Sequence, residues 1–272
     1  MVLDGQDWKK AIDTHRIAPC ESLIKKRLES YRERGYTYLR DGGDRWGAGA
    51  KARQLSPSYG ITYRTPLAPL CKAGCYGAFI GETFENLKEY AGLVAKQRIL
   101  GADFIKIMIS GLMDFSRPGE LFMEGPEEAQ IRQMVHIAHE EGFSVMAHCN
   151  GSYAALAAAE MRVESIEHGA YLGDEALHAM AENKVVWVPT LSTIGNLLGK
   201  GRYPDSGVQK ILESATANVA AYHAMGGLVA PGSDAGAWAV PHDADTEESW
   251  LLQAGISAAH QQAGAQEIIN RF

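Results

Sequence analysis

The sequence lacks the features that mark several classes of protein. It has no basic block or stripe, and its net charge is −7 over 272 residues, so nucleic-acid binding has little support. No run of about 18 apolar residues is present, so we expect no membrane-spanning helix. The first residues contain no apolar core of a signal peptide. Four cysteines are too few for a disulfide framework in a chain of this length, and we expect a cytoplasmic protein.

What the sequence does contain is an alternation of strand-like and helix-like segments. Hydrophobic residues make up 46% of the chain, which is ordinary for a domain with a sizeable core. Short apolar runs alternate with stretches of helical periodicity, which is typical of a parallel sheet covered by helices. We predict strands at residues 36–41, 61–66, 104–109, 143–148, 163–168, 185–191 and 228–234.

This pattern predicts one α/β domain over residues 1–272, with a TIM-type (β/α)8 barrel. Such a barrel needs one more strand before the helix predicted at residues 20–34. Only residues 1–3 are strand-like there, so we expect the barrel to be incomplete at strand 1. Residues 67–82 have no clear periodicity and are interpreted as a long functional loop. Thr83 is predicted to cap a helix that reaches about Leu100.

Four side chains suited to metal or acid–base chemistry stand at the ends of predicted strands. They are Lys106, His148, His168 and Asp234. The carboxyl ends of the strands of a parallel barrel open onto one face, where active sites are built. Histidine and aspartate are ligands of divalent transition metals. The sequence therefore predicts that these four residues share one site.

Each of these residues also has a plainer interpretation, which the sequence leaves open. A histidine at a strand end can be an ordinary hydrogen-bonded residue, and Asp234 can cap a turn or helix. Lys106 can instead act as a Schiff-base nucleophile, as lysines on barrel strands do in some lyases. Cys71 and Cys75 have a spacing that zinc sites use, but no second ligand pair follows, so we expect free thiols.

Five segments together resemble the amidohydrolase superfamily, especially its imidazolonepropionase-like and prolidase-like branch. They are residues 101–108 (GADFIKIM), 145–151 (VMAHCNG), 165–169 (SIEHG), 188–191 (VPTL) and 230–235 (APGSDA). The resemblance implies a distorted (β/α)8 barrel that binds one or two divalent metal ions, often zinc. It also implies hydrolysis of amide or ester bonds, frequently in cyclic amides or dipeptides.

The resemblance assigns a role to each of the four residues. Lys106 matches a lysine after strand 4 that can be carboxylated to bridge two metal ions. His148 and His168 match the metal ligands of strands 5 and 6. Asp234 matches the strand 8 aspartate, which positions and deprotonates the attacking water. An unmodified Lys106 ammonium has no lone pair, so carboxylation is needed for it to be a ligand.

The chain departs from the family pattern at its beginning. The family has a His-x-His pair after strand 1, whereas the near match here is His15 followed by Ile17. The small accessory β-sandwich of the family is not evident either. Two hypotheses follow: a metal-dependent hydrolase that cleaves an amide C–N bond in a dipeptide, acylated amino acid or cyclic amide, and a truncated, non-catalytic barrel with weak or no metal binding.

Substrate contacts are predicted at three positions near the site. Tyr171 lies in the loop after strand 6, Arg64 ends the strand at residues 61–66, and His242 lies in the loop after the last strand. Any of them can meet a substrate carboxylate or amide, and each also has a structural interpretation. Asp41 is expected to tie its loop through hydrogen bonds. We expect the partner to be a small-molecule amide or peptide, and the chain to form a homo-oligomer.

Overall fold

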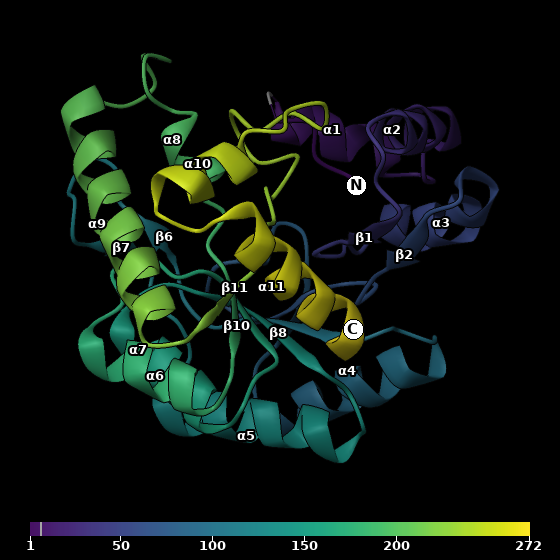
Figure 1. Ribbon diagram of the computed structural model, residues 1–272. Coiled ribbons are helices and arrows are strands. Elements are labelled where there is room, and N and C mark those ends of the chain that lie inside the picture. The colour runs from purple at the N-terminus through teal and green to yellow at the C-terminus, as the bar shows by residue number, and fades with distance from the viewer. Residues whose placement is uncertain (6) are drawn as a thin grey trace.

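The computed structural model describes residues 1–5 and 7–272, which form an α/β fold around a parallel sheet (Figure 1). Among these residues, the sheet has seven strands in the order β11-β10-β9-β8-β5-β3-β4, with every neighbouring pair parallel. The strand bounds are β3 Leu70–Lys72, β4 Glu82–Phe84, β5 Ile105–Met108, β8 Val145–Cys149, β9 Ser165–His168, β10 Val186–Val188 and β11 Leu228–Val229.

Two smaller sheets accompany the main one. The strands β1 (Tyr38–Arg40) and β2 (Thr62–Arg64) form a parallel pair, and β6 (Leu112–Met113) and β7 (Leu121–Phe122) form an antiparallel pair. Each strand predicted from the sequence has a counterpart, namely β1, β2, β5, β8, β9, β10 and β11. The alternation of apolar runs and helices was therefore a sound basis for the α/β class.

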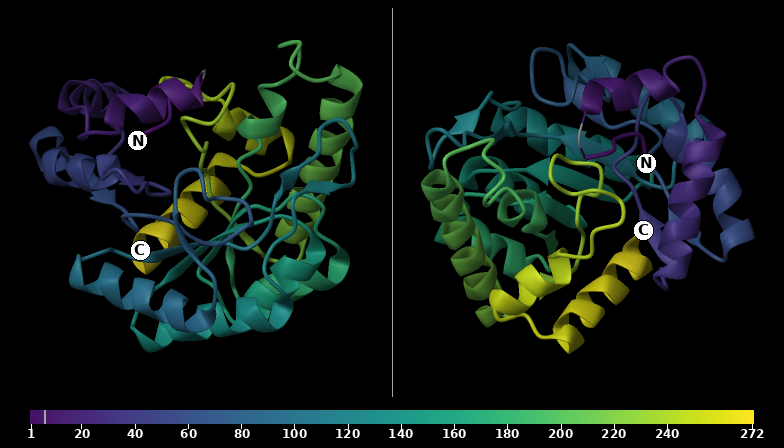
Figure 2. Two further views of the ribbon diagram at one scale, coloured as in Figure 1. Left: turned by 180° about the vertical axis from the view of Figure 1, so that it is seen from behind. Right: turned by 90° about the horizontal axis from the view of Figure 1, so that it is seen from above.

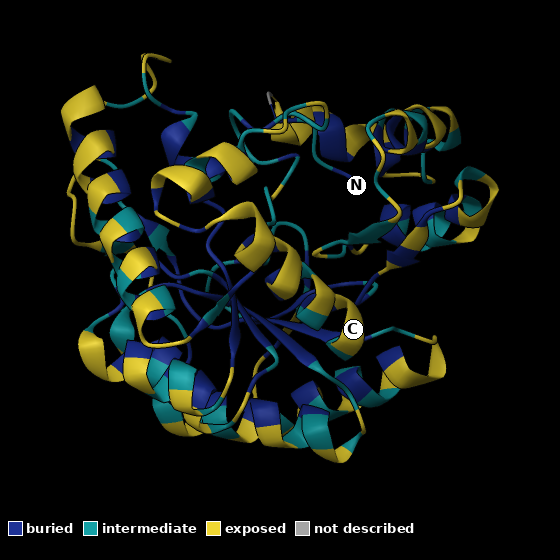
Figure 3. Cartoon of the chain, viewed as in Figure 1, coloured by how far each residue is buried: buried dark blue, intermediate teal, exposed yellow. Residues whose placement is uncertain are grey.

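Helices wrap the outside of the sheet, with buried faces inward and exposed faces outward (Figure 3). In α5, the buried residues Ile131, Met134, Val135 and Ala138 recur at helical spacing and join the main core. The helices are α1 Trp8–His15, α2 Glu21–Glu33, α3 Ala48–Leu55, η1 Ser56–Tyr59, α4 Leu87–Ile99, α5 Glu128–Glu140, α6 Ser152–Glu160, α7 Asp174–Glu182, α8 Ser192–Gly195, α9 Asp205–Ala224, α10 Glu247–Gln253 and α11 Ala258–Arg271.

The central strands are buried on both faces. Every residue of β5, β8 and β10 is buried, which explains why these segments are nearly continuous apolar runs. Burying one valine or isoleucine side chain contributes about 1.5–3 kcal/mol, so these strands form a rigid base for the residues that follow them. The polar residues within them, Lys106 and His148, are exceptions that call for a functional explanation.

A closed eight-stranded barrel is not found among the described residues, because β1 and β2 form a sheet of their own, separate from the seven-stranded sheet that has β11 at one edge. The helix α11 fills the interval between them (Figure 2). Its Ile268 and Phe272 pack in one cluster with Tyr38 of β1 and Leu228 of β11. The expected gap at strand 1 is thus occupied by a helix.

The backbones of α11 and β11 also approach each other closely. The amide of Ala230 donates to Trp187 of β10, so the neighbouring Val229 carbonyl points away from β10. A Cβ added to Gly264 of α11 would lie 2.1 Å from that carbonyl oxygen. Only glycine allows this approach, and α11 therefore covers the outer edge of β11.

Two local predictions were wrong. Residues 67–82 were expected to be a loop, but they contain β3 and the first residue of β4. Thr83 lies inside β4, and the helix cap is Asn86, whose side chain accepts a hydrogen bond from the Glu89 amide. Three-residue strands carry too little periodicity to be recognised in a sequence.

Two other expectations agree with the structure. Cys20, Cys71, Cys75 and Cys149 are all free thiols. Among the described helices, none is both long enough and apolar enough to cross a membrane.

Candidate functional site

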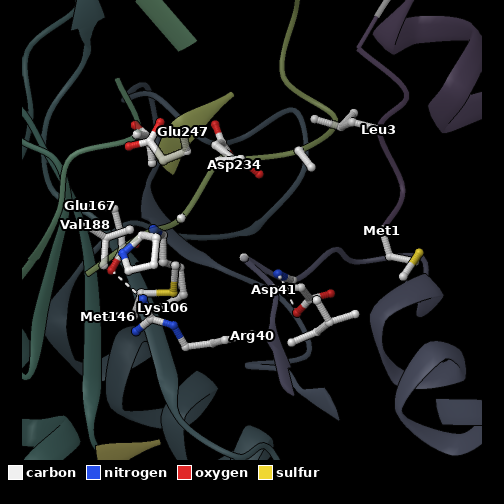
Figure 4. A pocket seen from close by; sticks show the side chains of 18 of the residues that line it. Met1, Leu3, Arg40, Asp41, Lys106, Met146, Glu167, Val188, Asp234 and Glu247 are labelled. Carbon is white, nitrogen blue, oxygen red and sulfur yellow. Dashed lines mark hydrogen bonds and ion pairs between the residues drawn. The ribbon is translucent and has the colours of Figure 1, made fainter. Parts of the chain in front are cut away.

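The carboxyl ends of β5, β8 and β9 open onto a cavity of about 510 Å³ (Figure 4). This volume lies within the range of small-molecule sites, and most of the lining is apolar. The cavity is lined by all four residues predicted to share a site, namely Lys106, His148, His168 and Asp234.

The imidazole rings of His148 and His168 converge at this cavity. Their centroids are 4.6 Å apart and their planes are inclined by 62°. The parallel pairing of β8 with β9, in which Cys149 is opposite His168, brings the two strand ends together. His148 Nε2 donates a hydrogen bond to the Gly111 carbonyl at 3.2 Å, which leaves its Nδ1 with a lone pair.

Both histidines are neutral at physiological pH. Burial is the main cause, since it lowers the pKa of His148 well below its usual value and that of His168 to about 3. The positive charge of Lys106 lowers the pKa of both rings further. Neutral imidazoles are the form that accepts protons or binds metal ions.

Lys106 lies in the interior of the protein, with an exposed fraction of 5%. Burial lowers its pKa from 10.5 to about 8, while Glu167 and Asp234 oppose this effect. Near neutral pH the amine is therefore still mostly protonated, but a minor unprotonated fraction exists, which is the form needed for carboxylation or for attack on a carbonyl.

A buried ion pair stands beside Lys106 that the sequence analysis did not single out. The Arg40 guanidinium donates to the Glu167 carboxylate at 3.0 Å and to the Ser165 hydroxyl at 2.8 Å. Figure 4 shows Arg40, Lys106 and Glu167 together at one end of the cavity. Glu167 directly precedes His168 within the SIEHG segment, but nothing in the sequence pairs it with a residue of β1.

Asp234 and Glu247 lie at the opposite end of the cavity (Figure 4). Asp234 is exposed to the cavity, and the protein atoms around its carboxyl group raise its pKa, an effect that Lys106 opposes. Glu247 accepts hydrogen bonds from the amides of Leu191 and Ser192, at 2.9 and 2.7 Å. Burial raises the pKa of Glu247 to about 7. Glu247 was not identified from the sequence.

Three residues around the cavity have left-handed backbone conformations that are unusual for side chains other than glycine. The φ angles are 72° for His168, 50° for Thr190 and 51° for Asp234. For β-branched Thr190, a positive φ is a genuine outlier. Backbone strain of this kind clusters at functional sites. Its presence after β9, β10 and β11 therefore supports a functional role for this cavity.

An aromatic pair from the segment between β3 and β4 forms another wall. The Tyr76 ring lies 4.8 Å from the His148 ring and 5.6 Å from the Phe79 ring. Gly77 permits this, since its φ is 110° and an added Cβ would lie 2.7 Å from Met108 Cγ. The sequence predicted a functional loop here, but it did not identify these aromatic residues.

The three residues predicted to contact substrate lie in different places relative to the cavity. His242 lines the cavity, but its ring is fixed between the Tyr31 hydroxyl and the Leu3 carbonyl, each at 2.8 Å. Arg64 is outside the cavity lining and pairs with Asp103. Tyr171 is also outside the lining.

Two other predicted positions are explained by hydrogen bonds. Asp41 Oδ1 accepts from the Gly43 amide at 3.1 Å, which confirms that it ties its loop. His15 is fully buried and lies outside the cavity lining, and its Nδ1 accepts from the Cys20 amide. It does not replace the first histidine of a His-x-His pair.

The donor set fits a metal ion only with one modification. His148 and His168 supply two neutral imidazoles, but among the described residues no three His, Cys, Asp and Glu side chains are grouped closely enough to hold an ion. Carboxylation of Lys106 would add an oxygen donor beside the histidines. The lowered pKa of Lys106 is compatible with this chemistry, because carboxylation requires the neutral amine.

Comparison with known proteins identifies similar folds. No protein-family model matches the chain. An uncharacterised protein of Mycobacterium tuberculosis is 30% identical over 141 residues, a match that covers 50% of this chain and 38% of that protein. An uncharacterised protein of Mycobacterium bovis matches to the same extent. The chain thus spans well under half of these curated relatives.

Solved structures are similar over most of the chain. A Xaa-Pro dipeptidase with bound methionine has a TM-score of 0.74 and 20% identity, covering 90% of this chain and 66% of its own. An A. niger ochratoxinase has a TM-score of 0.79 and 20% identity, covering 97% and 68%. A prolidase in complex with N-methylphosphonate-L-proline has a TM-score of 0.75 and 22% identity, covering 95% and 70%.

These likenesses confirm the predicted resemblance to prolidase-like amidohydrolases at the level of the fold. At such identities they say nothing about which residues act, so the function has to be argued from the cavity itself.

Proposed function

We propose that this chain carries the active site of a metal-dependent amide hydrolase, with a barrel-type fold opened between β11 and β1. The observation that supports this most directly is the convergence of the His148 and His168 rings, 4.6 Å apart, in a cavity that also contains Lys106 and Asp234. The substrate would be a small molecule with an amide C–N bond, such as a dipeptide, an acylated amino acid or a cyclic amide.

In this proposal, His148, His168 and a carboxylated Lys106 would hold a divalent ion, with zinc as the first candidate. A bound ion of this kind supplies Lewis-acid activation of water and of the amide carbonyl. Asp234 would accept a proton from the water and deliver it to the leaving amine, since it is a carboxylate accessible from the cavity. Its raised pKa brings its proton affinity closer to neutral pH, which suits that exchange.

Elemental analysis of the purified protein tests the metal assignment. We expect zinc, manganese or iron at one or two equivalents, and lower occupancy in both His148→Ala and His168→Ala. The exposed His178→Ala is the matched control and should keep its metal. Full occupancy in both cavity variants, or no metal together with no activity gained on adding metal, would contradict the proposal and favour a non-catalytic barrel.

A Schiff-base lyase is the second candidate, and the lowered pKa of Lys106 favours it, because imine formation needs a neutral amine. Borohydride reduction in the presence of small aldehydes and ketones distinguishes the two. A stable adduct on Lys106 would support the lyase, whereas the hydrolase predicts no adduct and cleavage in a broad amide screen.

A further inference from the structure

The buried Asn150 joins the ends of three neighbouring strands. Its Nδ2 donates to the Gly111 carbonyl at 2.9 Å, its Oδ1 accepts from the Ala170 amide at 2.9 Å, and its own amide donates to Ser110 Oγ at 2.6 Å. Asn150 is 1% exposed and lies outside the cavity lining, so it does not contact substrate directly. It instead links residues that follow β5, β8 and β9, the strands that carry the amine and the two imidazoles of the cavity.

The orientation of the Asn150 side-chain amide is determined by its partners. A carbonyl oxygen can only accept a hydrogen bond, and a backbone N–H can only donate one. Nδ2 must therefore face Gly111, and Oδ1 must face Ala170. The Gly151 amide also donates to the Ala170 carbonyl at 2.7 Å. Residues 150–151 and Ala170 are thus joined by two hydrogen bonds of opposite direction, which fix the end of β8 relative to the end of β9.

The Gly111 carbonyl is the point at which this network reaches a proposed metal ligand. The same oxygen accepts from Asn150 Nδ2 at 2.9 Å and from His148 Nε2 at 3.2 Å. Ser110 Oγ, which accepts from the Asn150 amide, donates to this carbonyl as well, at 3.1 Å. Asn150 therefore reaches Gly111 by two routes. A carbonyl held in this position keeps the ring proton of His148 on Nε2 and leaves Nδ1 with its lone pair.

We propose that Asn150 is a positioning residue that fixes the tautomer of the His148 ring through the Gly111 carbonyl. Its bond to Ala170, two residues after His168, holds the end of β9 beside that ring. The proposal rests on the proposed metal-dependent function and adds a residue to it. A ring whose orientation and lone pair are already fixed loses less freedom when it binds an ion, so Asn150 raises the affinity of the site for the ion.

NMR spectra that correlate the ring protons and ring ¹⁵N nuclei of the metal-stripped full chain show the tautomer directly. In the unmodified protein we expect the His148 ring as the Nε2–H form, with well-separated resonances for its two nitrogens, and His148→Ala assigns them. In Asn150→Leu, which has a similar size but no polar side-chain atoms, the two resonances should approach each other, because the ring exchanges between tautomers. A His148 ring protonated on Nδ1 in the unmodified protein, or an unchanged ring pattern in Asn150→Leu, would overturn the proposal.

The affinity for zinc gives a second readout. In buffer with bicarbonate, which supplies the carboxyl group for Lys106, Asn150→Leu should bind zinc about 10- to 100-fold more weakly in chelator competition. Circular dichroism checks that the variant is folded, and Asn150→Ser, whose side chain is too short to reach both partners, replaces it if it is not.

Asn218→Leu is the matched control. The Asn218 Nδ2 donates to the Leu172 carbonyl at 2.6 Å, and this half-buried side chain of α9 lies outside the cavity lining. The control thus loses a bond of the same kind without a direct effect on His148. It should keep both the zinc affinity and the ring pattern. Equal weakening in Asn218→Leu would show a general loosening of the protein and contradict the positioning role of Asn150.

The two readouts separate this proposal from the proposed function. If the unmodified protein binds zinc, and Asn150→Leu binds it equally tightly with the same His148 ring pattern, the positioning role is wrong and the metal site stands. If the unmodified protein binds no zinc, but the ring pattern changes in Asn150→Leu and not in Asn218→Leu, the positioning role stands and the metal-dependent function is contradicted.

Discussion

His168 Nδ1 and Thr190 Oγ1 are 2.7 Å apart, which joins the end of β9 to the residues that follow β10. Thr190 is 3% exposed, so this contact is protected from water. When Nδ1 donates to the threonine, Nε2 is left with its lone pair for the cavity. A partner of this kind fixes both the tautomer and the orientation of an imidazole.

Replacing Thr190 should therefore weaken the site without touching a proposed ligand. Thr190→Val keeps the shape of the side chain but removes its hydroxyl oxygen. We expect the affinity of the protein for zinc to fall about 10- to 100-fold, as measured by chelator competition. Thr190→Ser keeps the oxygen and should retain most of the affinity. Equal affinity in the valine variant, with an unchanged ¹⁵N shift pattern for His168, would show that Thr190 does not position the ring.

Lys106→Met should stabilise the protein. At pH 7 the lysine is charged in the unfolded chain. Burying this charge in the folded protein costs free energy, and this cost is what lowers the pKa of the folded lysine to about 8. Removing the charge should raise the free energy of unfolding by about 3 kcal/mol in urea titrations. The gain should shrink between pH 8 and 10.5, as the unfolded state also loses its proton. A less stable variant at pH 7 would contradict this account.

The Arg40–Glu167 pair should show strong coupling. Arg40→Met leaves a carboxylate buried without a cation and should cost about 3–5 kcal/mol of unfolding free energy. Glu167→Gln alone leaves Arg40 without its counter-charge. The double variant should be less destabilised than the sum of the two single variants, measured by a double-mutant cycle. Additive effects would show that the two side chains do not interact.

Protonation of the two cavity histidines in the unfolded chain should cost the protein stability in acid. His148 and His168 stay neutral when folded, because their pKa values are lowered, whereas in the unfolded chain they bind protons below about pH 6.5. The contribution of each histidine should therefore be full above pH 6.5 and decline as the pH falls toward 3, by about 1–2 kcal/mol between pH 7 and 5. Glu247 acts in the opposite direction, because its pKa of about 7 favours the folded state as the pH falls, so the histidine effect is measured as the difference between the protein and its variant. His168→Asn should flatten this dependence, whereas the exposed His178→Asn should not.

Gly77→Ala should disturb the aromatic wall. Both Gly77 and Gly74 have positive φ, but only at Gly77 does an added Cβ meet neighbours, with Met108 Cγ at 2.7 Å. Gly74→Ala is therefore the matched control for backbone strain alone. We expect Gly77→Ala to be the less stable variant by about 1–3 kcal/mol in thermal or urea unfolding. Equal stability of the two variants would show that the segment between β3 and β4 can move to accommodate the added methyl group at no cost.

The sequence alone predicted the strand ends well, and for a physical reason. Lys106 and His148 are polar residues inside strands that are otherwise apolar, and such residues are conspicuous because burying them is costly. Residues at parallel strand ends converge, so order along the chain was enough to bring His168 and Asp234 into the same cavity.

The remaining features depend on contacts that a sequence does not encode locally. Arg40 and Glu167 are paired across the interior, and Glu247 comes from a helix far along the chain from Ser192. Tyr76 lies in a segment with no clear periodicity, in which three-residue strands and glycines determine the course of the backbone. The sequence therefore did not identify it. Such pairings follow from tertiary packing rather than from residue patterns.

The backbone contact between Gly264 and Val229 has a consequence for solution behaviour. A free outer strand of a sheet is a template onto which another polypeptide can add by main-chain hydrogen bonding. Because a helix lies against the outward carbonyl of Val229, this margin is shielded from such addition. A bulkier side chain at position 264 would push the helix away and expose this edge of the sheet, so Gly264 allows α11 to keep it covered against pairing with another chain.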